Sequence, residues 1–269
     1  MTTSPEESPC PEAFVDLARR LADRAREIIG HYFRGDFEVE QKPDLSPVTV
    51  ADRETESAMR SMIAETFPDH GILGEEYGAD RTDADYVWVL DPIDGTKRFT
   101  TGHAQFGTLI ALLHHGRPIL GVIDMPQMDE RWLGAAGRPT SHQDRRGTRA
   151  ARTRPCTDLA AAALYTTSPQ MFEGADFEAF ERLRMAVRTP LFGGECYSYG
   201  LLASGFSDLV IEADMDPYDY LSHVAVVIGA GGIITDWQGQ PLGLESDGRV
   251  LAAGTATLHR AAIDLLART

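Results

Sequence analysis

The sequence predicts a mixed fold, with an α+β first half and an α/β second half. Before residue 138, apolar residues recur first at helical spacing and then in paired, strand-like runs. After residue 155, short apolar strands alternate with helices, a pattern typical of α/β architecture. The chain has 269 residues, enough for one large domain or two moderate ones. Its 43% hydrophobic and 25% charged residues exclude a wholly disordered or coiled-coil protein.

Two helices are predicted near the N-terminus, after a polar leader. Residues 1–11 predict a disordered leader. Apolar residues over 14–32 follow a helical period, and this helix should end near Gly35. A second helix carries apolar residues over 59–67 and should stop before Pro68.

Strands and a change of composition follow these helices. Residues 86–90 predict a buried strand, whereas 106–113 and 118–125 predict the two arms of a hairpin. A polar, basic segment then predicts a linker or exposed loop. The expected division is an N-terminal half, 12–138, a linker, 139–154, and a C-terminal half, 155–269.

The C-terminal half predicts three strands and three helices in alternation. The strands are expected at 164–166, 209–212 and 233–236, and the helices at 177–187, at 217–230 and up to Leu266.

The charge balance narrows the class of partner. With 25 Lys and Arg against 41 Asp and Glu, the formal net charge is −16. Such a surface repels phosphate backbones and anionic lipid, so we expect neither nucleic acid nor membrane as a partner. We also expect a soluble, cytoplasmic protein. Its three cysteines are scattered, it shows no basic and apolar leader, and no apolar run reaches about 20 residues.

The segment WVLDPIDGT carries the strongest chemical signal. An apolar strand runs into Asp91 and Asp94, and Gly95 then allows backbone N–H groups to face the same point. Two hard oxygen ligands beside free N–H donors suit a Mg²⁺-assisted phosphate site. The same residues are also compatible with a turn that merely closes a strand.

Three other acidic residues stand at the expected ends of elements. Glu75, in the motif GEE, comes just after the apolar pair Ile72 and Leu73 and can therefore lie at the end of a strand. The alternative is that Glu75 is a solvated residue of a charged loop. Asp52 lies three residues after Thr49, which fits either a capped helix start or a carboxylate aimed at a metal-bound water. Asp219 opens an apolar helix, where an acid is favoured in any case by the helix dipole.

Taken together, these motifs resemble the inositol monophosphatase superfamily. The order and spacing of GEE, WVLDPIDGT and an Asp before a helix ending in AGG match over about residues 42–236. Segments such as ECYSYGLLASGFSDLVIE and PYDYL are most similar to the histidinol-phosphatase branch. The resemblance implies a layered αβαβα sandwich, Mg²⁺-dependent phosphatase activity and a homodimer.

The resemblance also implies roles for particular residues. It assigns metal binding to four carboxylates and to one backbone carbonyl: Glu75, Asp91, Asp94 and Asp219, with the carbonyl of Ile93. Asp52 and Thr96, with Glu75, match the catalytic residues that orient and deprotonate the attacking water. Gly95 and Thr96 match backbone donors to the phosphate. Two Mg²⁺ ions would neutralise the four carboxylates, and the substrate phosphate could bring a third.

Substrate binding is expected at a second group of residues. Gly193, Gly194 and Glu195 align with the junction that lines the alcohol side of the pocket, and Glu212 matches a substrate-contacting Glu. Two carboxylates there suit the cationic alcohol of histidinol phosphate, although Glu195 also fits a helix N-terminal acid. Arg98 departs from the pattern; it could add a phosphate contact or point to solvent, and we expect the latter.

The function predicted is therefore hydrolysis of a small phosphomonoester, with L-histidinol phosphate, a late intermediate of histidine biosynthesis, as the substrate. The alternatives are an inositol-1-monophosphatase or a phosphatase of broad specificity. A third, of another class, is a catalytically silent regulatory relative that only binds metal.

Overall fold

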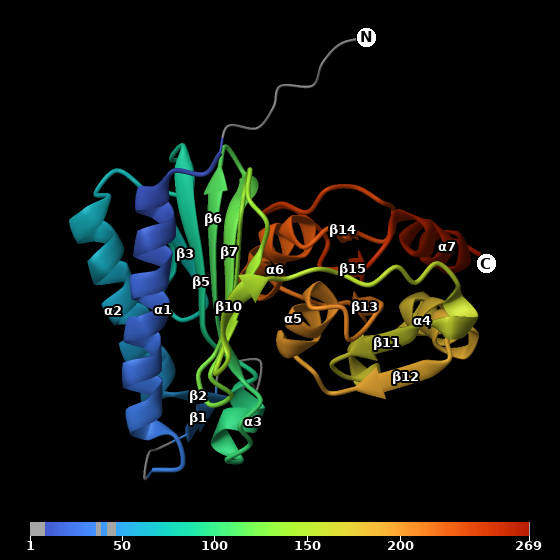
Figure 1. Ribbon diagram of the computed structural model, residues 1–269. Helices are drawn as coiled ribbons and strands as arrows, with labels where there is room; N and C mark the ends of the chain where they lie inside the picture. Colours follow the sequence, from blue (N-terminus) through green and yellow to red (C-terminus); the bar gives the residue numbers. More distant parts are fainter. Residues whose placement is uncertain (1–8, 36–38, 42–46, 269) are drawn as a thin grey trace.

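The chain folds into five alternating layers of helices and sheets (Figure 1). The computed structural model describes residues 9–35, 39–41 and 47–268. An outer helix pair covers an eight-stranded sheet, a second pair separates this sheet from a five-stranded one, and a third pair covers the far side. In order, the pairs are α1 (Glu12–Tyr32) with α2 (Val50–Thr66), α5 (Tyr197–Ala203) with α6 (Pro217–Gly229), and α4 (Gly174–Ala186) with α7 (Ala256–Leu266). The expected αβαβα sandwich is confirmed.

The outer helices form where the apolar spacing predicts them. α1 buries one apolar stripe against the sheet, and α2 begins at a capping box in which Thr49 and Asp52 exchange hydrogen bonds. The predicted leader lies outside the described residues up to position 8, but the prediction of disorder is wrong for its last part. Cys10 is buried and donates its backbone N–H to the Ala136 carbonyl at 3.0 Å. Within the described residues, every helix is too short or too polar to span a bilayer.

The first sheet has the order β10-β9-β8-β7-β6-β5-β3-β4. Its strands are β3 (Gly71–Gly74), β4 (Gly78–Asp80), β5 (Tyr86–Asp94), β6 (Gly107–His114), β7 (Arg117–Met125), β8 (Glu130–Ala135), β9 (Ser141–Asp144) and β10 (Gly147–Ala150). A separate small ribbon pairs β1 (Val39–Gln41) with β2 (Pro47–Thr49). β6 and β7 are the predicted hairpin, and β3 and β5 are the parallel pair within this sheet.

The expected linker is different in the structure. Residues 139–154 contain the hairpin of β9 and β10, which extends the first sheet through β8. Every side chain of β10 is exposed, so the alternation of apolar and polar residues that marks a half-buried strand is missing there. The prediction of a linker is therefore wrong for the two strands.

The second sheet has the order β12-β11-β13-β15-β14 and is mixed. β11 pairs in parallel with β12 and β13, whereas β15 is antiparallel to both of its neighbours. The strands are β11 (Ala163–Thr166), β12 (Thr189–Phe192), β13 (Leu209–Glu212), β14 (Ile233–Thr235) and β15 (Val250–Ala253); short 3-10 turns lie at η1 (Leu159–Ala161) and η2 (Pro169–Met171). β12 and β15 were not expected from the sequence.

The helix α6 lies between the two sheets and is buried over most of its length. Its backbone approaches the first sheet so closely that a Cβ at Gly121 would collide with the Ser222 carbonyl, and one at Gly134 with the Ala225 carbonyl. Two glycines on neighbouring strands therefore set the height of α6 above the sheet. The first turn of this helix carries Asp219.

Candidate active site

The parallel pairing of β3 and β5 places two acidic segments at one edge of the first sheet. Both strands end there, and the backbone N–H of Glu75 donates to the Leu90 carbonyl at 3.2 Å. The pairing of β5 with β6 is irregular between Asp91 and Asp94, where Pro92 interrupts the ladder. Glu75, Asp91 and Asp94 are thereby directed to the same region.

Asp91 is the most buried of these carboxylates, at 1% exposure. Its Oδ1 atom has no hydrogen-bond partner. Burial, and then the negative charges of Glu75, Asp94 and Asp219, hold the pKa of Asp91 well above its ordinary value. The site therefore contains an excess of negative charge that its own side chains do not neutralise.

Asp94 and Asp219 approach from the two sides of this region. Asp94 accepts a hydrogen bond from the backbone N–H of Cys196 at 2.8 Å, and burial raises the pKa of Asp94. Asp219 accepts from the backbone N–H of Asp216 at 2.8 Å, in the capping box of α6. Burial and the charge of Asp94 raise the pKa of Asp219 well above its ordinary value.

Asp52 belongs to the capping box of α2, in which Thr49 is the N-cap, and lies close enough to Glu75 to feel its charge. Its Oδ2 accepts from the backbone N–H of Thr49 at 2.8 Å and from the Thr49 hydroxyl at 2.6 Å, while Oδ1 is buried without a hydrogen-bond partner. Burial raises the pKa of Asp52 to about 6, and the charge of Glu75 contributes to this shift. The capping function and the placement at the site are thus compatible.

The short helix α3 (Thr96–Thr100) begins directly at the end of β5. Gly95 caps it in the left-handed region at φ 85°. The hydroxyl of Thr96 donates to the Ile93 carbonyl at 3.0 Å, which fixes the orientation of the one backbone carbonyl expected to bind metal.

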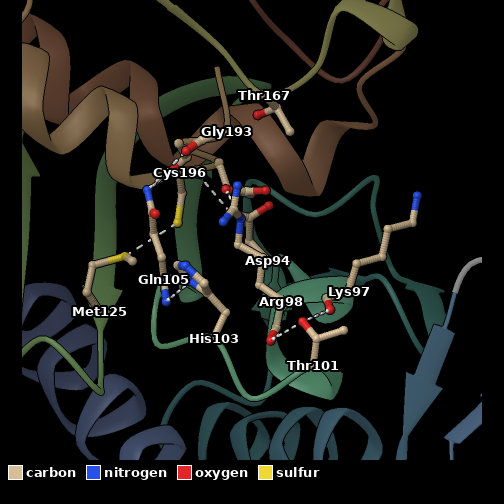
Figure 2. A network of polar contacts seen from close by, with 12 residues as sticks. Asp94, Lys97, Arg98, Thr101, His103, Gln105, Met125, Thr167, Gly193 and Cys196 are labelled. Atoms are coloured by element: carbon tan, nitrogen blue, oxygen red, sulfur yellow. Dashed lines mark hydrogen bonds and ion pairs between the residues drawn. The ribbon is translucent and has the colours of Figure 1, made fainter. Parts of the chain in front are cut away.

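Three residues of the predicted substrate-binding group, Gly193, Gly194 and Glu195, lie at the junction between β12 and α5. Figure 2 shows the polar contacts that reach this junction from Asp94 and from Gln105. Gln105 donates to the carbonyls of Gly193 at 3.4 Å and Gly194 at 3.3 Å. Glu195 is held at a positive φ of 41°, which is unusual for a residue with a side chain.

The expectation that Arg98 points to solvent is wrong. Its Nε atom lies 2.5 Å from Oε2 of Glu195, and the two side chains are only 25% and 12% exposed. The residues are 97 positions apart in sequence, which is why a local reading could not pair them. Burial nevertheless raises the pKa of Glu195 above its ordinary value.

Glu212 ends β13 close to this junction. Its Oε1 accepts from the backbone N–H of Thr167 at 2.9 Å and from the Thr167 hydroxyl at 3.1 Å. Burial raises the pKa of Glu212 to about 8. The buried hydroxyl of Tyr199 has no hydrogen-bond partner, and the nearby charges of Glu212, Asp94 and Asp219 add to the effect of burial in raising its pKa well above the ordinary value.

Sequence reasoning missed Glu56, which positions the loop around Glu75. The Glu56 carboxylate is fully buried and accepts from the backbone N–H groups of Glu76 at 2.7 Å and Tyr77 at 3.1 Å. It also accepts from Arg60 at 2.7 Å. In the sequence, Glu56 and Arg60 form an ordinary i, i+4 helix pair, so nothing local marks this function.

The donor set fits a hard divalent cation such as Mg²⁺. All its side-chain donors are carboxylates, and the orphaned Oδ1 of Asp91 lacks the partner that a cation would provide. Among the described residues, no group of three or more His, Cys, Asp or Glu side chains is arranged to hold a metal ion.

Comparisons with known proteins point to one family. The model of the inositol monophosphatase family matches residues 11–268. The bifunctional phosphatase IMPL2 of Arabidopsis thaliana, a chloroplastic protein, is 48% identical over 95% of this chain and 75% of its own length. The histidinol-phosphatase of Mycobacterium tuberculosis is 36% identical over 83% of this chain and 87% of its own.

A solved structure extends the likeness to three dimensions. An inositol monophosphatase from Zymomonas mobilis superposes with a TM-score of 0.86 at 46% identity, over 95% of this chain and 98% of that one. The fold and the family match thus define a phosphatase, of a family whose members are generally metal-dependent. The chain belongs to the inositol monophosphatase family.

Proposed function

We propose that the protein is a Mg²⁺-dependent phosphomonoesterase whose preferred substrate is L-histidinol phosphate. The observation that carries the proposal is the presence of two separate acidic groups. One surrounds Asp91 at the edge of the first sheet, and the other, Glu195 and Glu212, lies at the junction of the second. The first group suits cations beside a phosphate, and the second suits a positively charged alcohol.

In this proposal, Glu75, Asp91, Asp94, Asp219 and the Ile93 carbonyl would hold the metal ions. When bound, Mg²⁺ neutralises phosphate charge and lowers the pKa of water. Asp52, Glu75 and Thr96 orient and deprotonate the water for in-line attack, and the unpartnered Oδ1 of Asp52 is available to accept its proton.

Binding of the phosphate and of the alcohol involves different halves of the chain. The backbone N–H groups of Gly95 and Thr96, at the start of α3, bind the phosphate oxygens. Gly193, Gly194, Glu195 and Glu212 bind the alcohol. This assignment is supported by the histidinol-phosphatases among the relatives, for instance the one from Chlorobaculum parvum at 30% identity. Under this proposal, the protein would hydrolyse L-histidinol phosphate as a step of histidine biosynthesis.

A second candidate is an inositol-1-monophosphatase or a phosphatase of broad specificity. The ion pair between Arg98 and Glu195 favours it, because it reduces the negative charge that a cationic alcohol would meet. Inositol monophosphatases also occur among the relatives, including one named inositol monophosphatase 2 from Solanum lycopersicum at 29% identity.

Phosphate release from histidinol phosphate and from inositol 1-phosphate, measured side by side with Mg²⁺ and with EDTA, tests these assignments. We expect kcat/KM to favour histidinol phosphate by about a hundredfold, which is about 2.7 kcal/mol of transition-state discrimination. Comparable rates would reject the preference and retain the phosphatase. Activity that survives EDTA would reject the metal mechanism, and no activity on any phosphomonoester would identify a silent, metal-binding relative.

We further propose a homodimer, as the family resemblance implies, and a cytoplasmic location, as the few scattered cysteines predict. Light scattering coupled to gel filtration should give twice the chain mass of 29.5 kDa. A mass equal to one chain would contradict the dimer.

A further inference from the structure

Arg98 and Glu195 form an ion pair across the candidate active site. Arg98 belongs to α3, immediately beyond the expected phosphate donors, and Glu195 belongs to the junction between β12 and α5. Both side chains are mostly buried, and their charged atoms lie 2.5 Å apart. The contact therefore joins the phosphate side of the site to the alcohol side.

The residues around this ion pair hold both side chains in place. A Cβ at Gly193 would collide with the Arg98 guanidinium, so the glycine leaves room for it. Glu195 has a left-handed backbone conformation, and its neighbour Cys196 is fixed by the hydrogen bond to Asp94. Gln105 secures the carbonyls on the other side of the junction.

The contact is ionic but poorly aligned for hydrogen bonding. The Arg98 Nε and Glu195 Oε2 atoms are both buried, and neither has a hydrogen-bond partner of good geometry. A carboxylate in this state retains acceptor capacity, and a better-aligned donor can replace the present partner. The ion pair can thus be exchanged when a ligand supplies its own cation.

We propose that Arg98 is a specificity-determining residue that competes with a cationic alcohol for Glu195. This inference deepens the proposed function, on which it rests for the position of the alcohol. A phosphomonoester with an ammonium or imidazolium group must displace Arg98, whereas a neutral polyol phosphate need not. Arg98 therefore weakens the binding of cationic substrates and shifts the specificity towards neutral ones.

Substitutions of Arg98 provide the test. Arg98→Gln removes the charge and retains much of the stem, and Arg98→Lys is the matched control that retains the charge. We expect Arg98→Gln to raise the ratio of kcat/KM for histidinol phosphate to that for inositol 1-phosphate by about tenfold, mainly through KM. Arg98→Lys should keep the ratio within about twofold of the wild type, because the competing cation remains.

A binding measurement provides a readout that does not depend on turnover. Calorimetry with L-histidinol, in the presence of Mg²⁺ and inorganic phosphate, should show about tenfold tighter binding to Arg98→Gln than to the wild type. In a Glu195→Gln background, Arg98→Gln should change neither the ratio nor the affinity by more than about twofold, because the carboxylate is gone. Thermal unfolding of each variant identifies any that fails to fold.

The outcomes separate this inference from the proposed function. An equal fall in kcat/KM for both substrates would show that Arg98 binds phosphate or supports the fold, and an unchanged ratio would show that it does not compete. Either result overturns the inference but leaves the phosphatase intact. If the wild type fails to hydrolyse histidinol phosphate, the proposed substrate is wrong, and the histidinol affinities still decide the competition at Glu195.

Discussion

Carboxylates of the candidate active site are held by backbone N–H donors, with few cationic side chains among their partners. Each of four acids accepts one such bond at 2.8 or 2.9 Å: Asp52 from Thr49, Asp94 from Cys196, Asp219 from Asp216 and Glu212 from Thr167. A backbone donor fixes one oxygen without neutralising the charge. These bonds leave the negative charge to a cation or a proton, although the Thr166 hydroxyl also donates to the second oxygen of Glu212 at 3.5 Å.

Asp94→Asn separates the chemistry from the fold. The amide oxygen can still accept the hydrogen bond from Cys196, so folding should be retained. Loss of the charge should lower kcat by about a hundredfold or more. Stability in EDTA should not fall, because one source of repulsion is removed.

Steady-state kinetics and thermal unfolding check this expectation. Asp16→Asn, on the exposed face of α1, is the matched control and should change neither quantity. An unchanged rate for Asp94→Asn would reject the assignment of this site.

Asp52 should make the metal-free protein less stable as the pH rises. Its pKa is about 6 in the fold and 3.8 in the reference state, so the folded protein holds the proton to higher pH than the unfolded chain. The free energy of unfolding contributed by Asp52 is therefore present below pH 3.8 and is lost as the pH rises to about 6. The loss is about 3 kcal/mol at most.

Denaturant unfolding in EDTA between pH 4 and 7 measures this effect. Asp52→Asn should give a shallower fall of stability with pH than the wild type does. An identical slope for the two proteins would show that Asp52 is not the group responsible.

At the scale of elements, the turn between β3 and β4 depends on α2 through Glu56. This buried carboxylate accepts from two backbone N–H groups of the turn and from Arg60. Glu56→Gln retains one acceptor oxygen but removes the charge, so the turn that carries Glu75 should loosen. We expect kcat to fall about tenfold and stability to fall by about 1–3 kcal/mol.

Kinetics and urea unfolding distinguish the two effects. Glu65→Gln on the exposed side of the same helix is the control and should be neutral. If Glu56→Gln lost stability without any change in kcat, Glu56 would be a structural residue with no influence on the position of Glu75.

Elements with a clear hydrophobic period were predictable, and those without one were not. The stripes of α1 and α2 and the apolar runs of β6 and β7 predict their structures directly. The strand β10 is exposed throughout, and β12 is exposed or half-buried, so neither carries the expected pattern. These strands form because the edge of an existing sheet offers them hydrogen bonds.

The same distinction applies to the candidate site. Its acidic residues were identified because each stands at the end of a predicted element or in a motif. Arg98 and Glu56 act through partners from other elements, and a sequence reveals such contacts only when the topology is known.

At the scale of the whole molecule, the uncompensated charge of the acidic site should make the stability of the fold depend on cations. A ligand that binds only the folded state at a hundred times its Kd adds about 2.7 kcal/mol of stability. We therefore expect Mg²⁺ to raise Tm relative to EDTA, and to raise it less in Asp94→Asn. Differential scanning fluorimetry checks this, with Na⁺ at equal ionic strength as the control. An equal rise with Na⁺ would indicate general screening of the −16 net charge instead of a bound ion.

The position of α6 between the two sheets has a consequence for how the chain unfolds. Its buried side chains share one core with strands of both sheets, so neither sheet can open without exposing this helix. The two halves should therefore melt together, although their topologies differ. Single-tryptophan variants that keep either Trp132, in the first sheet, or Trp237, beside the second, should show the same urea midpoint. Two separate midpoints would mean that one sheet survives alone. A common midpoint would show that α6 couples the unfolding of the two sheets. A destabilising substitution beside either sheet would then lower the stability of the whole molecule.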